Sequence, residues 1–180
     1  MGSATFNVAI GDRFESVVAA HSRRCALQTI RGAWSYQQLD DAANRIAQVV
    51  DQSCKEDNTP VALLLETSRE LFASMLAIVK VGRIFVCLDP AALVSRSSAI
   101  LENSGARTLL TNNRQKRRAS EIANDRTRIV DIQQAEAPPS NIALDSINPQ
   151  SPYCILYTTG TTGQPKGVLR SHCGLMLQIK

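Results

Sequence analysis

The sequence lacks an uninterrupted apolar run of the ~18 residues that a membrane-spanning helix requires, so we expect no membrane span. Its first residues, MGSATFNVAIGD, also lack the basic stretch and long apolar core of a signal peptide. The five cysteines form no CxxC pair, which predicts reduced thiols, no metal-ligand set and a cytoplasmic protein. Cys25, Cys87 and Cys154 lie in apolar runs, where buried thiols are expected; a catalytic cysteine is the alternative.

A strong excess of one charge is missing too. The chain has 20 Lys and Arg against 16 Asp and Glu, a net charge of +4. The densest basic run, at residues 114–118, has no interleaved aromatic residue. We expect it on the solvated face of a helix, and we predict no nucleic-acid partner.

Three helices are predicted by capping-box patterns, in which Ser, Thr or Asp precedes Glu or Gln by three residues. The patterns begin at Asp12, Ser35 and Thr67. The helices after Ser35 and Thr67 each carry one broad apolar face. Gly82 is predicted to end the third helix.

Short apolar runs between these helices predict strands. They lie at 61–65, 84–88 and 108–111, with a further candidate at 128–132 and a strand-like run at 153–157. Continuous rather than alternating apolar runs indicate strands covered on both faces. Helix-linked strands of this kind form a doubly wound, mostly parallel sheet flanked by helices, so the predicted fold class is α/β.

A proline-rich stretch divides the chain. Residues 135–152 hold four prolines among Ser and Asn, which predicts an irregular connection. We therefore predict an N-terminal α/β subdomain at 1–134. After the connection, residues 153–180 are predicted to form a strand, a loop and the start of the next element.

The stretch TTGTTGQPKG, residues 158–167, offers hydrogen-bond donors and one cation directly after a predicted strand. Ligands bind at that end of the strands in α/β sheets. Gly160, Gly163 and Gly167 can take positive φ and turn N–H groups toward a guest, while Lys166 adds a full charge. No acidic residue lies within 153–180, so the complementary ligand is a polyanion, most simply a nucleoside triphosphate. A flexible surface loop is the alternative.

Two familiar phosphate-binding motifs do not fit this loop. The Walker P-loop places Gly-Lys-Ser/Thr after four variable residues, whereas Lys166 is followed by Gly167 and Val168. The dinucleotide fingerprint Gly-x-Gly-x-x-Gly does not occur.

The segment YTTGTTGQPKGV (157–168) resembles the phosphate-loop signature of the adenylate-forming, AMP-binding enzymes. These include acyl-CoA synthetases, luciferases and the adenylation domains of nonribosomal peptide synthetases. WSYQQLDDAANRIAQVV (34–50) is similar to the family's early Tyr-x-x-Leu helix, and LAIVKVGRIFVCLDPA (76–91) to its Lys-Ala-Gly strand segment. Beyond these, the sequence is closest in style to amino-acid adenylation domains, with Arg96 at the position of their arginine. The resemblance covers 14–172 and implies an incomplete N-terminal part of a larger adenylation domain.

Some positions depart from the family pattern. Val81 replaces a usual alanine and Cys87 a usual proline, while Thr159 stands where serine is commonest and keeps the hydroxyl. Arg170 is larger and more charged than the usual residue there. His172 matches a histidine often found after the motif, and a packing or capping role at a helix start is as good an expectation as ligand contact.

The resemblance implies that ATP is the cofactor, bound through its phosphates. The expected cofactor-binding residues are Thr158, Thr159, Gly160, Thr161, Thr162, Gly163 and Lys166. Lys166 and Thr161 are the expected catalytic residues, drawing charge from the leaving pyrophosphate.

The implied reaction joins a carboxylate to ATP, giving acyl-AMP and pyrophosphate. Because the sequence is closest in style to amino-acid adenylation domains, the expected carboxylate is an amino acid. Mg²⁺ is expected in the complete enzyme, and the acyl group then passes to coenzyme A or to a carrier-protein phosphopantetheine. The isolated chain is expected to be inactive and to need the downstream half of the domain as its partner. The alternative function is a non-catalytic remnant or split half that binds an anion or a partner.

Overall fold

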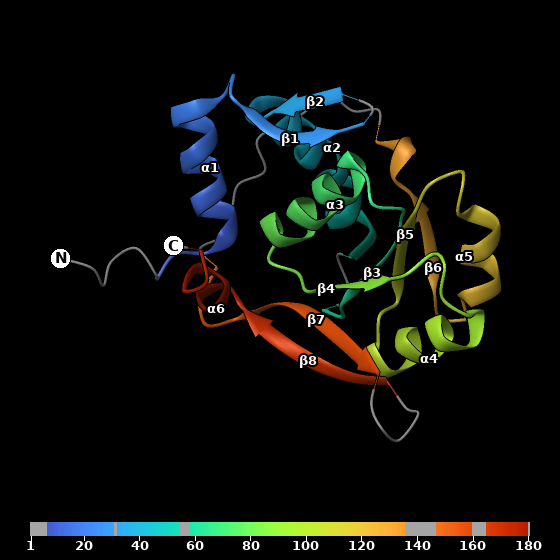
Figure 1. Ribbon diagram of the computed structural model, residues 1–180. Helices are drawn as coiled ribbons and strands as arrows, with labels where there is room; N and C mark the ends of the chain where they lie inside the picture. Colours follow the sequence, from blue (N-terminus) through green and yellow to red (C-terminus); the bar gives the residue numbers. More distant parts are fainter. Residues whose placement is uncertain (1–6, 31, 55–57, 136–146, 160–164, 180) are drawn as a thin grey trace.

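The computed structural model describes residues 7–30, 32–54, 58–135, 147–159 and 165–179 (Figure 1). The helices are α1 (Ile10–His21), α2 (Tyr36–Cys54), α3 (Arg69–Lys80), α4 (Val94–Ser104), α5 (Lys116–Ile122) and α6 (His172–Met176). The strands are β1 (Cys25–Thr29), β2 (Gly32–Ser35), β3 (Val61–Leu64), β4 (Phe85–Leu88), β5 (Thr108–Thr111), β6 (Arg128–Asp131), β7 (Pro152–Thr159) and β8 (Pro165–Ser171), with a 3-10 turn at Ile132–Gln134.

A six-stranded sheet runs through the molecule in the order β6-β5-β3-β4-β7-β8. All neighbouring strands are parallel except β7 and β8, which form an antiparallel hairpin. The prediction of an α/β fold with a doubly wound, mostly parallel sheet is confirmed. Strands β1 and β2 form a separate antiparallel hairpin outside this sheet.

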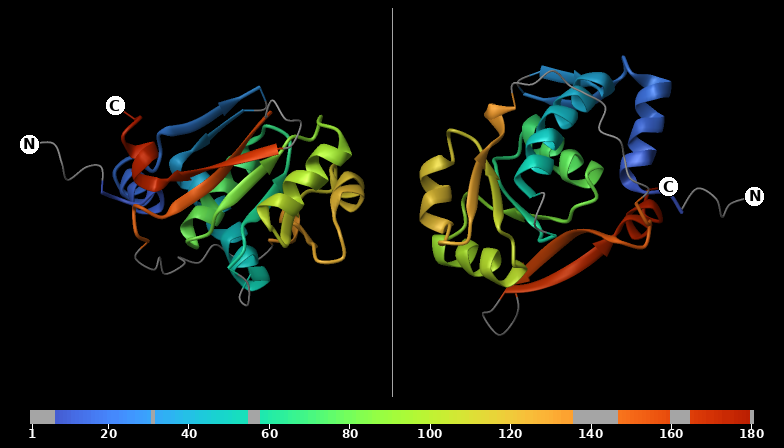
Figure 2. Two further views of the ribbon diagram at one scale, coloured as in Figure 1. Left: turned by 90° about the horizontal axis from the view of Figure 1, so that it is seen from below. Right: turned by 180° about the vertical axis from the view of Figure 1, so that it is seen from behind.

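The helices cover both faces of the sheet (Figure 2). Successive side chains of a strand point to opposite faces. Leu63 accordingly joins a core with Val50 of α2 and Ile78 of α3, whereas Leu64 joins a second core with Leu101 of α4. β3 and β5 are buried along their whole length, as continuous apolar runs predict.

The capping box predicted at Ser35 is present. The Gln38 N–H donates to Ser35 Oγ at 3.2 Å, and the Ser35 N–H donates to Gln38 Oε1 at 2.9 Å. The cap predicted at Thr67 is wrong by one residue, because Ser68 Oγ accepts from the Leu71 N–H at 3.3 Å.

The other two predicted helix limits differ in outcome. α1 begins at Ile10, so Asp12 lies inside the first turn and does not cap the helix. Its N-cap position, Ala9, is fully buried and makes no side-chain cap, which shows that packing rather than a polar cap fixes this start. Gly82 follows α3 with φ +68° and its N–H donates to Val79 O, so the predicted stop is confirmed.

The expected burial of the cysteines holds for one of three. Cys154 on β7 is 2% exposed, whereas Cys25 and Cys87 are exposed. Cys25 lies on the β1–β2 hairpin, outside the central sheet. Cys87 lies on β4 beside two surface pockets, so its face of the strand is not covered there.

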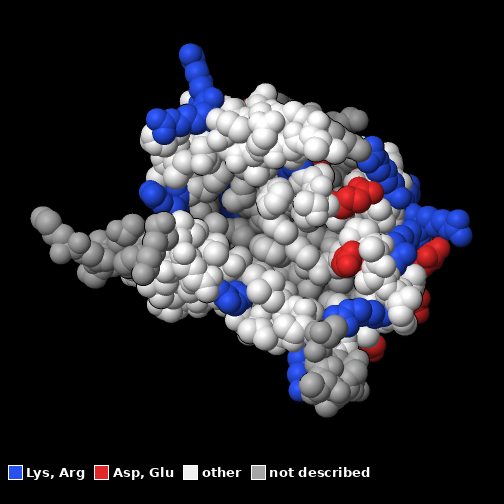
Figure 3. Space-filling model, viewed as in Figure 1, with Lys and Arg blue, Asp and Glu red and all other residues white. Residues whose placement is uncertain are grey.

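The basic run at 114–118 reaches into α5 and faces solvent in part. The Arg117 side chain is 94% exposed and pairs with Glu121 at 3.2 Å. Arg118 is half-buried and donates to the Ala92 carbonyl. Figure 3 shows Lys and Arg mixed with Asp and Glu along this side of the molecule, which is a solvated mixed-charge face.

The C-terminal hairpin shares the sheet with the rest of the chain. β7 pairs with β4, with Phe85 opposite Cys154, so segments 1–134 and 153–180 meet within one sheet. Most of the predicted connection, residues 136–146, lies outside the described residues. The division at 134 and 152 stays a prediction. Among the described residues, no helix combines the length and apolar character needed to cross a bilayer.

Candidate functional site

The hairpin β7–β8 positions the ends of the predicted phosphate loop. Thr158 is the cross-strand partner of Lys166, and Thr159 is the partner of Pro165 in the last pair before the loop. Both Thr158 and Lys166 are exposed. Directly opposed residues of an antiparallel pair point to the same face, so their side chains can address one ligand. The predicted residues Gly160, Thr161, Thr162 and Gly163 lie outside the described residues.

Gly167 serves the hairpin through its missing side chain rather than through positive φ. The positive-φ glycines of the described chain are Gly32, Gly82 and Gly105, so the expected conformation of Gly167 is wrong. A Cβ at Gly167 would lie 2.9 Å from Ile155 Cγ2 and 3.1 Å from the Tyr157 ring. The glycine therefore lets the tyrosine of β7 lie across β8.

Tyr157 anchors the strand that enters the loop. Its hydroxyl donates to Asn103 Oδ1 of α4 at 2.7 Å. Burial raises the pKa of Tyr157 above its usual range, so the phenol stays protonated and keeps this donor. The sequence motif includes Tyr157, but nothing local indicates its partner on α4.

His172 is a packing residue in this structure. It is 1% exposed, and its Nδ1 accepts from the Ile10 N–H at 3.2 Å. Its ring centroid lies 5.6 Å from that of Tyr153. The cap of α6 is Ser171, whose Oγ accepts from the Gly174 N–H at 3.3 Å. Of the two roles expected at this position, packing fits these contacts.

The environment of His172 favours the neutral imidazole. Burial lowers the pKa of His172 below its ordinary value, and the nearby negative charge of Asp12 opposes that shift in part. A neutral ring is also what an accepting Nδ1 requires. The residue thereby joins the end of β8 to the start of α1.

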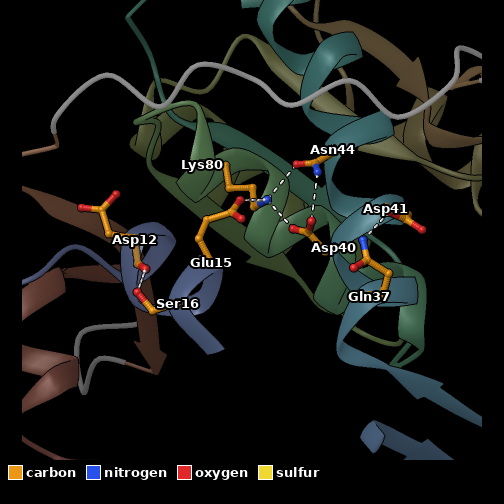
Figure 4. A network of polar contacts seen from close by, with 8 residues as sticks. All are labelled: Asp12, Glu15, Ser16, Gln37, Asp40, Asp41, Asn44 and Lys80. Carbon is orange, nitrogen blue, oxygen red and sulfur yellow. Dashed lines mark hydrogen bonds and ion pairs between the residues drawn. The ribbon is translucent and has the colours of Figure 1, made fainter. Parts of the chain in front are cut away.

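A buried ionic network that the sequence did not reveal lies between three helices (Figure 4). Lys80 of α3 is 2% exposed. Its Nζ donates to Asp40 Oδ1 at 2.5 Å, to Asn44 Oδ1 at 2.7 Å and to Glu15 Oε1. Asn44 Nδ2 also donates to Asp40 Oδ2 at 3.2 Å, which closes the network within α2.

One local signal does point to this network. Asp40 and Asn44 are four residues apart on the otherwise apolar face of α2. A carboxylate buried on such a face requires a polar or charged partner. Their partner Lys80 is 40 residues from Asp40 in sequence, and nothing local identifies it. Its ammonium is saturated by three oxygens, so the network holds α1, α2 and α3 together and is not a ligand site.

A magnesium site does not emerge from the described residues. They contain no group of three or more His, Cys, Asp and Glu that could hold a metal ion. The sequence from residue 153 to residue 180 has no carboxylate side chain, whereas Mg²⁺ prefers oxygen ligands that include carboxylates. The expected Mg²⁺ therefore finds no ligand set here, and no chemical step of this chain is assigned to it.

The chain is similar in sequence to a known family and to known proteins. The family model described as "AMP-binding enzyme" matches residues 14–180. Surfactin synthase subunit 3 of Bacillus subtilis (strain 168) is 32% identical over 168 residues, which are 93% of this chain and 13% of that protein. Bacitracin synthase 3 of Bacillus licheniformis is 35% identical over 141 residues, 77% of this chain and 2% of that protein. The chain thus spans a small part of these relatives.

Solved structures share the fold. The N-terminal subdomain of Klebsiella oxytoca NpsA superposes with a TM-score of 0.83 at 24% identity, over 94% of this chain and 43% of that one. The nonribosomal peptide synthetase FmoA3 superposes with a TM-score of 0.82 at 22% identity, over 98% and 19%. With the family match over residues 14–180, the resemblance predicted from the three motifs is confirmed: the chain belongs to the AMP-binding enzyme family and corresponds to the N-terminal portion of an adenylation domain.

Proposed function

We propose that this chain supplies the phosphate-binding loop of a ligase that activates an amino acid with ATP. The observation that carries the proposal is the pairing of Thr158 with Lys166 at the loop end of the β7–β8 hairpin. The cation is exposed, and no described residue pairs with it. Its charge is therefore available to a polyanion.

Relatives support the choice of reaction. One structure of the NpsA subdomain is described as a complex with 3-hydroxybenzoyl-AMSN, and the FmoA3 structure as a form bound to alpha-methyl-L-serine-AMP. In the proposed reaction a carboxylate oxygen of the amino acid attacks the α-phosphorus of ATP. The bond from that phosphorus to the bridging oxygen breaks, and pyrophosphate leaves with the electron pair.

The proposed role of the loop is to stabilise charge on the leaving group. Lys166 and Thr161 act as the catalytic donors to the β- and γ-phosphates. Thr158, Thr159, Gly160, Thr162 and Gly163 complete the cofactor-binding set. Such donors accelerate the reaction to the extent that they bind the charge developing on the pyrophosphate in the transition state more strongly than the charge of bound ATP.

The remaining partners belong to the same proposal. The acyl group passes to coenzyme A or to a carrier-protein phosphopantetheine, and Mg²⁺ accompanies ATP in the complete enzyme. The downstream half of the domain is the partner that completes the site. The five free thiols support a cytoplasmic location.

The test is carboxylate-dependent exchange of pyrophosphate into ATP, run over a panel of amino and fatty acids. We expect exchange from a full-length protein that contains this chain, and none from the 180 residues alone. Exchange by the isolated chain would refute the fragment interpretation. If a full-length protein binds ATP but no carboxylate of the panel supports pyrophosphate exchange, the result would favour the alternative, a non-catalytic anion-binding or partner-binding module.

A further inference from the structure

The β7–β8 hairpin extends beyond the strand that supports it. In the described sheet, the pairing of β7 with β4 ends at Ile155, opposite Val86, although β4 itself continues to Leu88. Beyond that point β7 pairs with β8, across what we call the loop end of the hairpin, residues 156–159 and 165–168. Two strands without further support are marginally stable in water, so the position of the loop end depends on another contact.

A pocket of about 270 Å³ lies beside the loop end, where β7 no longer pairs with β4. Its lining includes Cys87 of β4 and Asp89, which follows that strand, together with Leu156 and Tyr157 of β7. Close packing normally fixes the position of neighbouring elements. Because a pocket replaces close packing here, the sheet alone does not fix how far the loop end stands from the core.

The helix α4 lies beside the loop end and supplies the further contact (Figure 1). The Tyr157 hydroxyl donates to Oδ1 of Asn103, in the last turn of α4, at 2.7 Å. The Tyr157 ring lies across Gly167 of β8, where a Cβ would be 3.1 Å from it. One hydrogen bond therefore holds both strands of the loop end against α4.

This hydrogen bond and the proposed phosphate donors lie on opposite faces of the hairpin. Successive residues of a strand point to opposite faces, and directly opposed residues point to the same face. Thr158 and its partner Lys166 therefore point away from the face on which Tyr157 meets α4. A contact on that face can set the angle of the donors without reaching the ligand.

We propose that Asn103 is a positioning residue of the ligase, which holds the loop end through Tyr157 so that Lys166 meets the phosphates of ATP. The inference rests on the proposed function and adds to it a residue outside the loop motif. Donors that stabilise a transition state depend strongly on their placement, because a shift of about 1 Å can cost about 100-fold in rate. Asn103 itself touches neither ATP nor the amino acid in this proposal.

Three replacements separate the hydrogen bond from the bulk of the side chains. Asn103→Ala removes the acceptor, and Tyr157→Phe removes the donor but keeps the ring. Asn103→Asp keeps an oxygen that can accept the same hydrogen. Asn113→Ala is the matched control, because Asn113 is exposed and lies outside both α4 and the hairpin.

The measurement is kcat and KM for ATP in adenylation by a full-length protein that contains this chain. Asn103→Ala and Tyr157→Phe should each lower kcat by about 5- to 10-fold, which is the effect of one ordinary hydrogen bond. KM for ATP should change less, because the donors act mainly on charge that develops in the transition state. Asn103→Asp should recover most of the activity, and Asn113→Ala should match the parent.

A purely structural role predicts a different pattern. Asn103 is exposed and alanine is the better helix former, so Asn103→Ala should leave the unfolding midpoint near that of the parent. In a protein that already carries Lys166→Ala, adding Asn103→Ala should lower kcat much less than it does in the parent, since the donor that it positions is gone. A general loss of folded protein would lower kcat by the same factor in both backgrounds.

The outcomes distinguish this inference from the function on which it rests. If Lys166→Ala lowers kcat but Asn103→Ala does not, Asn103 has no positioning role and the proposed function stands. An equal loss from Asn103→Ala with and without Lys166 would also overturn the inference. If Lys166→Ala leaves kcat/KM unaltered, the proposed function fails, and the inference fails with it.

Discussion

Two lysines of this chain stand in opposite environments. Lys80, the last residue of α3, is 2% exposed and donates to three side-chain oxygens from α1 and α2. Lys166, on β8, is exposed and pairs with no described residue. The charge of Lys80 is neutralised by the fold itself, whereas that of Lys166 is free for a ligand. The contrast separates a lysine that stabilises the chain from one that serves its proposed function.

Removal of the buried cation, Lys80, is expected to have the most severe consequence. Lys80→Met removes the cation and leaves Asp40, whose side chain is 7% exposed, without its partner. We expect the free energy of unfolding to fall by about 3–5 kcal/mol, because an uncompensated buried charge remains. Denaturant unfolding of the chain measures the loss.

Two further variants show whether the charge itself is responsible. Lys116→Met, at an exposed lysine of α5, should change stability by no more than about 0.5 kcal/mol. Adding Asp40→Leu to Lys80→Met removes both buried charges and should recover part of the loss. A loss below about 1 kcal/mol for Lys80→Met would mean that the network contributes little to the fold.

The second prediction concerns Lys166. In a full-length protein, Lys166→Ala should lower kcat/KM for ATP in adenylation by about 10- to 100-fold, equivalent to about 1.4–2.8 kcal/mol. Its unfolding free energy should stay within about 0.5 kcal/mol of the parent, because the residue is exposed and pairs with no described residue. Thr161→Ala should cost less activity, because neighbouring hydroxyls still reach the phosphates. An unaltered kcat/KM for Lys166→Ala would favour the alternative interpretation, in which the loop is a flexible surface segment.

The features that could be predicted from the sequence are those formed by residues close together in the chain. The strands and the apolar helix faces follow from runs and periods of a few residues, so β3 and β5 were found close to their true limits. The phosphate-loop residues are contiguous, so their motif is legible without a structure. Local patterns also place the capping box at Ser35.

What was missed depends on parts far apart in the chain. The Lys80–Glu15 contact joins residues 65 apart, and it exists only after three helices pack together. Cys87 was expected to be buried because its neighbours are apolar, but the surface pockets beside the end of β4 leave it exposed. The role of Gly167 depends on Tyr157 lying opposite it on the neighbouring strand.

A third prediction concerns the start of α2, the helix that supplies Asp40 and Asn44. Ser35→Ala removes the cap oxygen that accepts the Gln38 N–H, and should cost about 1 kcal/mol of unfolding free energy. The loss should be smaller than for Lys80→Met, because the cap satisfies one helix end while the network joins three helices. Ser120→Ala, at an exposed serine within α5, is the control and should be nearly neutral. If Ser35→Ala equals Lys80→Met in cost, the network has no special weight.

The smallest expected effect concerns His172, where the end of β8 contacts the start of α1. His172 directly follows β8, which carries Lys166, and its Nδ1 accepts the N–H of Ile10, the first residue of the helix that carries Glu15. Burial lowers the pKa of His172 below its ordinary value of 6.5, so below that pH the unfolded chain binds a proton that the folded chain does not. Protons therefore favour unfolding, and stability should fall between pH 7.5 and pH 5.5.

His172→Gln should lose less stability over this interval than the parent chain, whereas His21→Gln, at the exposed second histidine, should behave like the parent. The measurement is denaturant unfolding at the two pH values. The effect should be the smallest of the four because only the part of the titration between the two pH values contributes. If His172→Gln and the parent lose the same stability, the neutral imidazole does not link the loop-bearing hairpin to α1, and the two regions are joined by apolar packing alone.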